Sequence, residues 1–364
     1  MNPAIRRFVL GAALLFAATP AAAQQPRVTN AQFQARPAPQ GIEREFRSIL
    51  ATQSAPAWVA YAVPMIAGER QMCCSNDGSY SSWRNCCRLE KNDGVSIHND
   101  DSGTSGSPIQ LEGPQRMLVL WRVEQKRVGR ILTVSEDCEL DAGGLPFLWL
   151  GNARGAESVA LLSKYVRPEE SDTREEKKLR DRAIFTMAYH ADPAADRALE
   201  NFVAPSQPES LREQTAFWLG VARGRSGYQL LQKMARQDRS ERVREKVAFA
   251  LSQSREPEAV DEMIHMARND ASSRVRGQAL FWLAQKAGKK AENAITSAIE
   301  NDPETGVKKK AVFALSQLPK QEGVPLLIQV ARTNRNPAVR KQAMFWLGQS
   351  NDARAVAFFE EVLR

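Results

Sequence analysis

The stretches KAVFALSQ (Lys310–Gln317) and QAMFWLGQ (Gln342–Gln349) place Phe and Gln at equivalent positions, and their two Phe residues lie 32 positions apart. The same spacing runs back through the sequence over six copies, at Phe185, Phe217, Phe249, Phe281, Phe313 and Phe345. A basic residue precedes each Phe by five positions, at Arg180, Arg212, Arg244, Arg276, Lys308 and Arg340. Six copies without an insertion indicate an internal repeat, and a repeat of this length decides the fold.

One copy of the repeat predicts two amphipathic helices joined by a turn. VREKVAFALSQ (243–253) is followed by the turn EPEA (256–259) and then by AVDEMIHMARND (259–270). On a helical wheel of about 100° per residue the first helix has one apolar stripe, formed by Val243, Val247, Ala250 and Leu251. Neither helix can bury its stripe alone, whereas stacked copies can, so the repeat predicts an elongated α-solenoid.

The repeat resembles the HEAT repeat, in the short form of the phycobilisome lyases. The pattern VRxxAxxxL follows a short loop that contains Asp, and the resemblance covers residues 146–364. It includes a degenerate first copy, WLGNARGAESVALLSKYV (149–166), which parallels WLGQSNDARAVAFFEEVL (346–363). The resemblance implies that each loop Asp pairs with the basic residue of the following helix, as Asp238 with Arg244, Asp270 with Arg276 and Asp302 with Lys308. Asn334 before Arg340 and Ser206 before Arg212 depart from this pattern.

The residue after each Phe belongs to the apolar stripe and alternates in size. We therefore predict that this position is core in every copy, at Trp218, Ala250, Trp282, Ala314 and Trp346. Large and small side chains in successive layers interdigitate better than a column of equal sizes. The alternation also indicates that a unit of two repeats was duplicated.

The repeated Phe lies roughly 150° from the centre of the buried stripe, and a Gln four residues later shares its side of the helix. The resemblance implies that these helices form the inner row of the solenoid. The predicted partner-binding residues on the concave face are then Phe217, Phe249, Gln253, Phe281, Gln285, Phe313, Gln317, Phe345 and Gln349. Exposed aromatic rows mark interaction surfaces. The alternative is that each Phe packs sideways against the neighbouring repeat, and the two roles are compatible.

Residues 1–23 have the pattern of a cleavable secretory signal. Arg6 and Arg7 precede the apolar run FVLGAALLFAA (8–18), and small residues (21–23) come before Gln24. The run is shorter than a membrane span requires, and no later window is long and uncharged enough to be one. We therefore expect a periplasmic or secreted protein, with residues 24–40 as a flexible tail.

Residues 41–145 predict a small β-rich domain that abuts the solenoid. The stretches WVAYAVPMI (58–66), VSIHND (95–100), MLVLWRVEQ (117–125) and RILTVSEDCEL (130–140) indicate strands, and KRVG (126–129) indicates a hairpin turn. All five cysteines lie in this domain, at Cys73, Cys74, Cys86, Cys87 and Cys138. In an exported chain they favour disulfides of undetermined connectivity, with one thiol left over. A metal site and redox chemistry are the alternatives.

The sequence contains parts of two catalytic patterns, and in each the other residues that the chemistry needs are missing. GTSGSP (103–108) has the form of the nucleophile loop of chymotrypsin-like proteases, but His98 lies only seven positions before Ser105, and the region is too short for two barrels. Hydroxylases built from such repeats bind iron through His-Glu pairs, and no Glu follows His98, His190 or His265. The net charge of +8 would suit nucleic acid in a cytosolic chain. Export instead favours anionic surfaces and acidic partners.

These features together predict a scaffold. We expect a non-enzymatic, exported protein that binds a protein or peptide of the cell envelope through the concave face of a solenoid, without a cofactor, metal or nucleic acid. The alternative is an envelope enzyme or thiol-redox protein centred on the Cys domain, with the repeats as a substrate platform. Attachment to cell-wall polymer is a third possibility. The sequence leaves the identity of the partner and the oligomeric state open.

Overall fold

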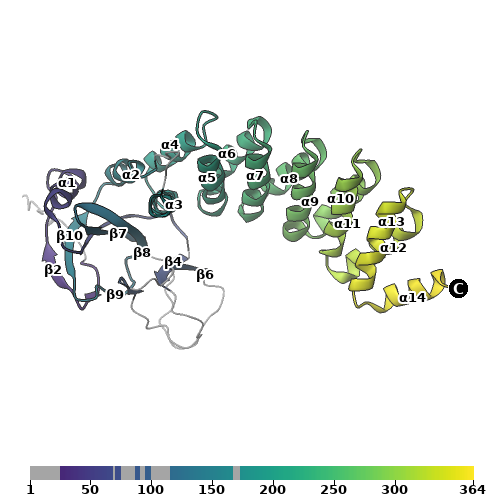
Figure 1. Cartoon of the computed structure of the whole chain (residues 1–364), viewed down its shortest axis with the longest axis horizontal. Helices are drawn as coiled ribbons and strands as arrows, with labels where there is room; N and C mark the ends of the chain where they lie inside the picture. Colours follow the sequence, from purple (N-terminus) through teal and green to yellow (C-terminus); the bar gives the residue numbers. More distant parts are fainter. Residues whose placement is uncertain (1–24, 69, 75–86, 91–94, 100–114, 167–172) are drawn as a thin grey trace, which may run out of the picture.

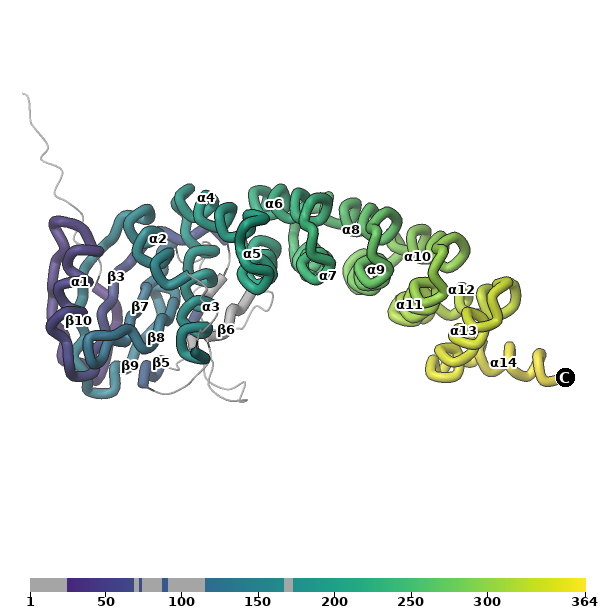
Figure 2. Tube along the Cα trace, turned by 45° about the horizontal axis from the view of Figure 1, so that its top comes forward, coloured from purple at the N-terminus to yellow at the C-terminus, as the bar shows by residue number. Residues whose placement is uncertain are grey.

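The chain forms a curved stack of helices with a β-sheet at its amino-terminal end (Figures 1 and 2). The computed structural model describes residues 25–68, 70–74, 87–90, 95–99, 115–166 and 173–364. The predicted signal (1–23) lies outside these residues. Among the helices that are described, none is both long and apolar enough to cross a membrane.

The six predicted copies each form a pair of helices. The first helices of the pairs line the inner side of the arc (Figure 1) and are α3 (Arg174–Ala188), α5 (Glu209–Ala222), α7 (Glu241–Gln253), α9 (Ser273–Ala287), α11 (Thr305–Ser316) and α13 (Pro337–Gln349). The second helices form the outer row and are α4 (Pro193–Phe202), α6 (Gly224–Gln237), α8 (Glu258–Asn269), α10 (Lys289–Asn301), α12 (Lys320–Thr333) and α14 (Ala353–Val362). The predicted stripe of α7 is fully buried at all four positions.

Capping side chains mark the start of several helices, and a glycine allows two helices to approach closely. Side chains cap several amino termini: Ser240 accepts from the Val243 N–H at the start of α7, and Asn336 accepts from the Ala338 N–H at the start of α13. At Gly220 a Cβ would come within 2.1 Å of the Ala250 carbonyl oxygen. Glycine is therefore needed where α5 passes α7.

Arginine side chains link the loops between successive repeats. Arg244 Nε lies 2.7 Å from Asp270 Oδ2, while Arg244 Nη1 donates to the Asp238 carbonyl at 2.8 Å. Arg276 makes the same two contacts, 2.7 Å to Asp302 Oδ2 and 2.9 Å to the Asp270 carbonyl. Each guanidinium therefore joins the loop before its own helix to the loop one repeat later. We call this series the arginine ladder.

The pairing that the resemblance implied is wrong for the side chains. Asp238 pairs with Arg212, at 2.8 Å, and not with the Arg244 guanidinium. The reason is that the aspartate oxygens are already engaged, since Asp238 Oδ1 also accepts from the Ser240 N–H at 2.9 Å and closes its own loop. The following Arg reaches only the backbone carbonyl of the Asp.

The arginine ladder lacks its Asp at two steps. At the first step Ser206 stands in place of Asp, and Arg180 Nε donates to Gln214 Oε1 at 3.4 Å. Between the last two loops of the ladder, Lys308 stands in place of the Arg and Asn334 in place of the Asp that it would bind. Lys308 Nζ donates to the Glu300 carbonyl at 2.6 Å, and Asn334 Nδ2 donates to Glu300 Oε1 at 3.3 Å. The predicted pair of Asp302 with Lys308 is therefore replaced by Arg276 with Asp302, at 2.7 Å.

The sheet has five strands in the order β2 (Gln32–Ala35), β10 (Pro146–Asn152), β3 (Ala57–Pro64), β7 (Arg116–Glu124) and β8 (Arg127–Ser135). Strand β10 runs parallel to both of its neighbours, and the other pairs are antiparallel. Three very short strands form a second sheet in the order β1 (Val28–Thr29), β9 (Leu140–Asp141) and β5 (Cys87–Arg88). The predicted strand at 95–100 is β6 (Val95–Asn99), which pairs with β4 (Arg70–Cys74).

Two predicted boundaries need correction. The segment 24–40, expected to be a flexible tail, contributes β1 and β2, because each pairs with a strand more than a hundred residues later in the sequence. The predicted first repeat copy from residue 146 begins as strand β10, and only its second half is helical, as α2 (Gly155–Ser163). The apolar run Phe147–Leu150 lies between two strands and is buried, so its side chains pack in the core of the sheet and do not form the apolar stripe of a helix.

The region predicted as β-rich also contains a helix and a shifted turn. Helix α1 (Ile42–Thr52) buries Phe46 against Trp121 of β7, with ring centroids 4.9 Å apart. The hairpin turns at Gln125 and Lys126, which have φ of 52° and 60°, and not at 126–129. Two positive φ values in a two-residue turn match the twist of the flanking strands.

The sheet and the first repeat share one core. The face of the sheet that carries Tyr61 and Trp121 joins a continuous cluster of buried side chains that extends to Phe358 in α14. The opposite face, with Trp58 and Leu120, packs under the short second sheet. Strand β8 contacts α3, where Thr133 Oγ1 lies 2.6 Å from Thr186 Oγ1. The β-rich region is thus packed as a cap on the solenoid.

His190 sits at this junction. It forms a β-bridge with Met65, and Ser158 Oγ lies 3.1 Å from its Nε2 and 2.8 Å from the Tyr61 hydroxyl. Burial lowers the pKa of His190 to about 3, with the Arg223 charge acting in the same direction and Asp192 opposing it. The folded protein therefore keeps this imidazole neutral.

We predict that completing the arginine ladder stabilises the carboxy-terminal repeats. Asn334→Asp alone should lower the midpoint of chemical unfolding, because the new carboxylate lies beside Glu300. Lys308→Arg combined with Asn334→Asp should restore a bidentate pair, with a coupling free energy of about 1–3 kcal/mol in a double-mutant cycle. The matched control is Lys309→Arg with Asn334→Asp, at an exposed neighbour. Equal coupling in both cycles would contradict the prediction.

We predict that His190 makes the junction sensitive to acid. Its folded pKa is depressed, so between about pH 6.5 and about 3 the unfolded chain binds a proton that the folded chain does not. The free energy of unfolding should fall by about 1.4 kcal/mol for each pH unit in this window. Unfolding measured at pH 7 and pH 5 should show a smaller acid loss for His190→Gln than for wild type. The exposed His265→Gln control should leave the acid loss unchanged.

Candidate functional site: the concave face

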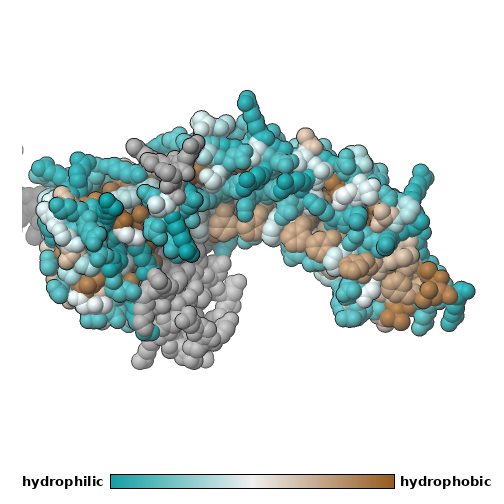
Figure 3. Space-filling view, in the orientation of Figure 1, coloured by the Kyte–Doolittle hydropathy of each residue, from teal (hydrophilic) through white to brown (hydrophobic). Residues whose placement is uncertain are grey.

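The concave face of the solenoid carries a band of apolar surface (Figure 3). Its aromatic residues come from the inner helices, one Phe from each. Phe185 is buried, the four that follow are half-buried, and Phe345 is 53% exposed. The Phe rings therefore pack between repeats, as one of the two alternatives predicted, and those after Phe185 also keep part of their surface exposed, so a role in binding stays a prediction. We call Phe217, Phe249, Phe281, Phe313 and Phe345 the Phe ladder.

The rings of the Phe ladder form a continuous series of contacts. Phe217 stacks on Phe249 with centroids 5.7 Å apart and planes 14° from parallel. Phe281 stacks on Phe313 in the same way, at 5.7 Å and 7°. Between these pairs Trp282 joins Phe249, at 4.6 Å, to Phe281, at 4.8 Å. Such pairs contribute about 0.5–1.5 kcal/mol each beyond the area they bury.

The position after each Phe is core only where it is alanine. Ala250 and Ala314 are fully buried, as predicted, whereas Trp218, Trp282 and Trp346 are half-buried. Each indole contacts the Phe of the preceding repeat, as Trp346 contacts Phe313 at 4.8 Å. The indole is too large for the buried stripe, so it fills the gap between repeats instead. The alternation therefore decides whether neighbouring Phe rings stack directly or through a Trp.

The predicted glutamines are exposed beside the Phe ladder. Gln253, Gln285, Gln317 and Gln349 all lie at the carboxy-terminal part of the inner helices. Gln285 Nε2 donates to Gln317 Oε1 at 3.3 Å, so the row connects adjacent repeats. An amide side chain offers both donors and acceptors to a ligand.

The concave face carries a depression of about 570 Å³ that crosses α3, α5 and α7 and is lined by Phe217, Trp218 and Phe249 together with Glu213 and Lys246. A smaller hollow of about 290 Å³ lies between the ends of α11 and α13 and the start of α12, and it includes Gln317, Trp346 and Gln349. Pockets of the first size suit a side chain or short segment of a ligand.

Sequence reasoning missed a polar row on the same face. Three residues before each Phe the chain alternates cation and amide, as Arg182, Gln214, Lys246, Gln278, Lys310 and Gln342. Residues three apart are neighbours on a helix, so this row flanks the Phe ladder. The alternation of cation and amide is present in the sequence, but it has a period of two repeats and is therefore missed when single copies are compared.

The cysteines are only partly described. Cys73 and Cys138 form a disulfide that ties β4 to the segment after β8, with Cα atoms 5.7 Å apart. Cys87 is also disulfide-bonded. Asp137 lies close to the sulfurs of Cys73 and Cys138, a combination of ligand types that could bind a metal ion. The two sulfurs are bonded to each other, however, so they cannot act as thiolate ligands in this state. Cys86 and the side chain of Cys74 lie outside the described residues.

The histidines and serines form no accessible catalytic group among the described residues. Ser105 lies outside them, as does the side chain of His98. Ser158 and His190 are hydrogen-bonded but fully buried, so a substrate cannot reach them. His265 is exposed on the outer row, with Nδ1 3.8 Å from Glu262 Oε1.

Comparison with known families agrees with the helical architecture. The family model for HEAT repeats matches residues 197–284 and 292–364. This part of the chain therefore belongs to the HEAT repeats, as its sequence resemblance predicted. No curated protein matches the sequence.

Several solved structures are similar to part of this chain at low identity. Human deoxyhypusine hydroxylase is 17% identical over 57% of this chain and 90% of its own, with a TM-score of 0.25. The CpcE and CpcF complex of phycocyanin lyase from Nostoc is 20% identical over 55% of this chain and 80% of its own, at 0.31. The S. pombe condensin Cnd3–Cnd2 subcomplex is 16% identical over 55% of this chain and 27% of its own, at 0.36. Likenesses of this size say nothing about function.

We predict that the Phe ladder stabilises the fold unequally along its length. Phe281→Ser removes a ring held between Trp282 and Phe313 and should lower the free energy of unfolding by about 2–4 kcal/mol. Phe345→Ser removes a ring that is half exposed and should cost less than about 1 kcal/mol. Chemical unfolding followed by circular dichroism compares the two. Equal losses would mean that Phe345 is packed as tightly as the inner rings.

Proposed function

We propose that this chain is a scaffold that binds a protein or peptide along its concave face, in the cell envelope. The observation that carries the proposal is the combined row of half-buried Phe and exposed Gln, which continues over successive inner helices. A surface of this kind presents apolar edges and amide groups along one line, as an extended ligand requires.

The envelope part of the proposal rests on the amino-terminal sequence. The basic, apolar and small-residue stretches of residues 1–23 follow the order of a secretory signal. The disulfide between Cys73 and Cys138 suits an oxidising compartment. Fractionation of cells that produce the full chain tests this part, and a cytosolic, uncleaved protein would overturn it.

We predict that the exposed glutamines are needed for binding and not for folding. Gln285→Ala, Gln317→Ala and Gln349→Ala together remove amide groups from exposed positions, so the helical circular dichroism should be unchanged. Capture from an envelope extract should retain a partner on the wild type and lose it on the variant. The partner should then bind the purified wild type directly.

The matched control removes glutamines from the outer row, with Gln229→Ala, Gln321→Ala and Gln329→Ala, which are also exposed. This control should retain the partner as the wild type does. Equal retention by the inner and outer variants, with both folded, would overturn the assignment of binding to the concave face.

A further inference from the structure

The carboxy-terminal part of the concave face is charged in one sense. Helices α9, α11 and α13 contain no Asp or Glu, and their basic residues are Arg274, Arg276, Lys286, Lys308, Lys309, Lys310, Arg340 and Lys341. The acidic residues near these helices lie on the outer row, as Glu262 in α8 and Glu300 in α10 do, or in the loops, as Asp302 and Glu304 before α11 do. The inner row therefore presents positive charge to whatever lies along it.

Several of these cations already have internal partners. Arg276 pairs with Asp302, Arg274 Nε lies 2.8 Å from Glu245 Oε1, and Lys286 Nζ donates to the Ser252 carbonyl at 2.9 Å. Burial lowers the pKa of Lys286. Such contacts position helices, and they do not leave a charge free for a ligand.

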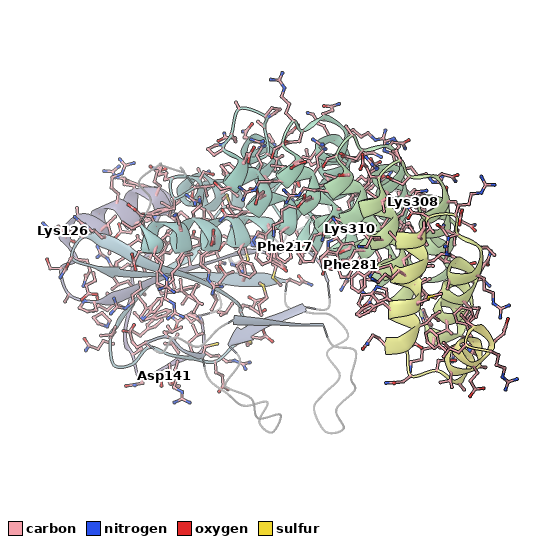
Figure 4. All side chains as sticks on the ribbon, turned by 45° about the vertical axis from the view of Figure 1, so that its right-hand side comes forward. Lys126, Asp141, Phe217, Phe281, Lys308 and Lys310 are labelled. Atoms are coloured by element: carbon pink, nitrogen blue, oxygen red, sulfur yellow. A yellow bond between two sulfur atoms is a disulfide. The ribbon has the colours of Figure 1, made fainter. Side chains whose placement is uncertain are left out.

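Four lysines on α7, α11 and α13 are exposed, and among the described residues no hydrogen bond or ion pair engages their side chains: Lys246, Lys309, Lys310 and Lys341. They occupy positions three or four residues before a Phe of the ladder, so they flank its rings. Lys310 lies across α9, where a Cβ at Gly277 would come within 2.3 Å of its Cδ. Figure 4 shows Lys310 beside Phe281, with Lys308 farther from that ring. Gly277 therefore makes room for this lysine next to the Phe ladder.

Resting on the proposed function, we propose that the ligand is an extended acidic polypeptide segment. Its carboxylates pair with the four free lysines, and its apolar side chains contact the Phe ladder. Its backbone amides form hydrogen bonds with the glutamine row, which is the exposed set Gln253, Gln285, Gln317 and Gln349. Charge complementarity selects the acidic partner, because the inner helices α9, α11 and α13 supply cations and no competing carboxylate.

A nucleic acid fits this surface less well than a peptide. Three residues before each Phe of the ladder lysine alternates with glutamine, whereas a phosphate backbone carries charge at every nucleotide and needs a denser basic track. Towards the amino-terminal end Asp181, Glu213 and Glu245 interrupt the positive charge. The amide row also supplies acceptors, which a peptide N–H can use and a phosphate cannot.

The period of the lysines sets a spacing for the acidic residues. Packed helices lie about 8–10 Å apart, so Lys246 and Lys310, which are two repeats apart, are separated by roughly 16–20 Å. An extended chain rises about 3.3 Å per residue. Acidic residues about five to six positions apart would therefore meet Lys246 and Lys310.

The test is fluorescence anisotropy with the folded, signal-free chain and synthetic peptides of roughly 18 residues in extended geometry. One peptide carries Glu at about every sixth position among Leu and Ser, and a second has Gln in place of each Glu. A third has the same composition with its Glu residues adjacent. Single-stranded DNA and inorganic polyphosphate are the other probes. The protein variants are Lys246→Gln with Lys310→Gln, which copies the residue found in alternate repeats, and the outer-row control Lys233→Gln with Lys290→Gln.

The expected result is binding of the spaced Glu peptide in preference to the other two peptides. The inner double variant should weaken that binding about three- to tenfold at low salt, and the outer control should leave it unchanged. Added salt should reduce the preference.

Other results overturn the proposal in distinguishable ways. Equal binding of the Glu and Gln peptides would keep the scaffold function and reject the acidic ligand. Stronger binding of DNA or polyphosphate, weakened by the inner variant, would assign the lysines to a polyanion. If no probe binds but a partner is captured through the glutamine row, the acidic ligand alone is rejected. If no probe binds and no partner is captured, the scaffold function is rejected too.

Discussion

The arginine ladder is the interaction on which the solenoid depends. A solenoid has contacts only between neighbouring repeats, so its shape follows from how each repeat is fixed to the next. Arg212, Arg244 and Arg276 each bind the carboxylate of the next loop, at 2.7–2.8 Å. The Asp of each pair also closes its own loop through a backbone N–H. Orientation is thereby fixed at the loops, and the helices between them are free to vary in sequence.

That freedom allows the inner helices to carry a surface with a period of two repeats. Phe is constant, but its neighbours alternate: Ala and a cation in one repeat, Trp and Gln in the next. The alternation has a packing consequence, since Phe rings stack directly in one gap and through an indole in the other. It has an electrostatic consequence as well, because the position three residues before each Phe of the ladder is positive only in every second helix.

The sequence predicts the solenoid well because its signals are local and repeated. The two helices of each copy, the buried stripe of α7 and the long strands β3 and β7 follow from periodicity within single segments. Strands β1 and β2 could not be found in this way, since they are short, and their partners lie more than a hundred residues away. The burial of Trp282 was overestimated because a helical wheel gives direction but not the volume available there. The side-chain partner of Asp238 was misassigned because the resemblance implied a pair with the Arg of the following helix, Arg244, whereas the carboxylate binds Arg212 of the preceding repeat.

The alternation of Trp and Ala after the Phe ladder imposes a rule of parity on the length of the solenoid. A single repeat inserted into the row would place two indoles, or two alanines, in adjacent gaps. Either arrangement would break the order in which gaps with directly stacked Phe rings alternate with gaps bridged by an indole. Insertions and deletions that preserve the inner surface therefore come in pairs of repeats. Evolution of such a chain would change its reach in steps of two repeats, with the sheet at the amino-terminal end as the fixed origin.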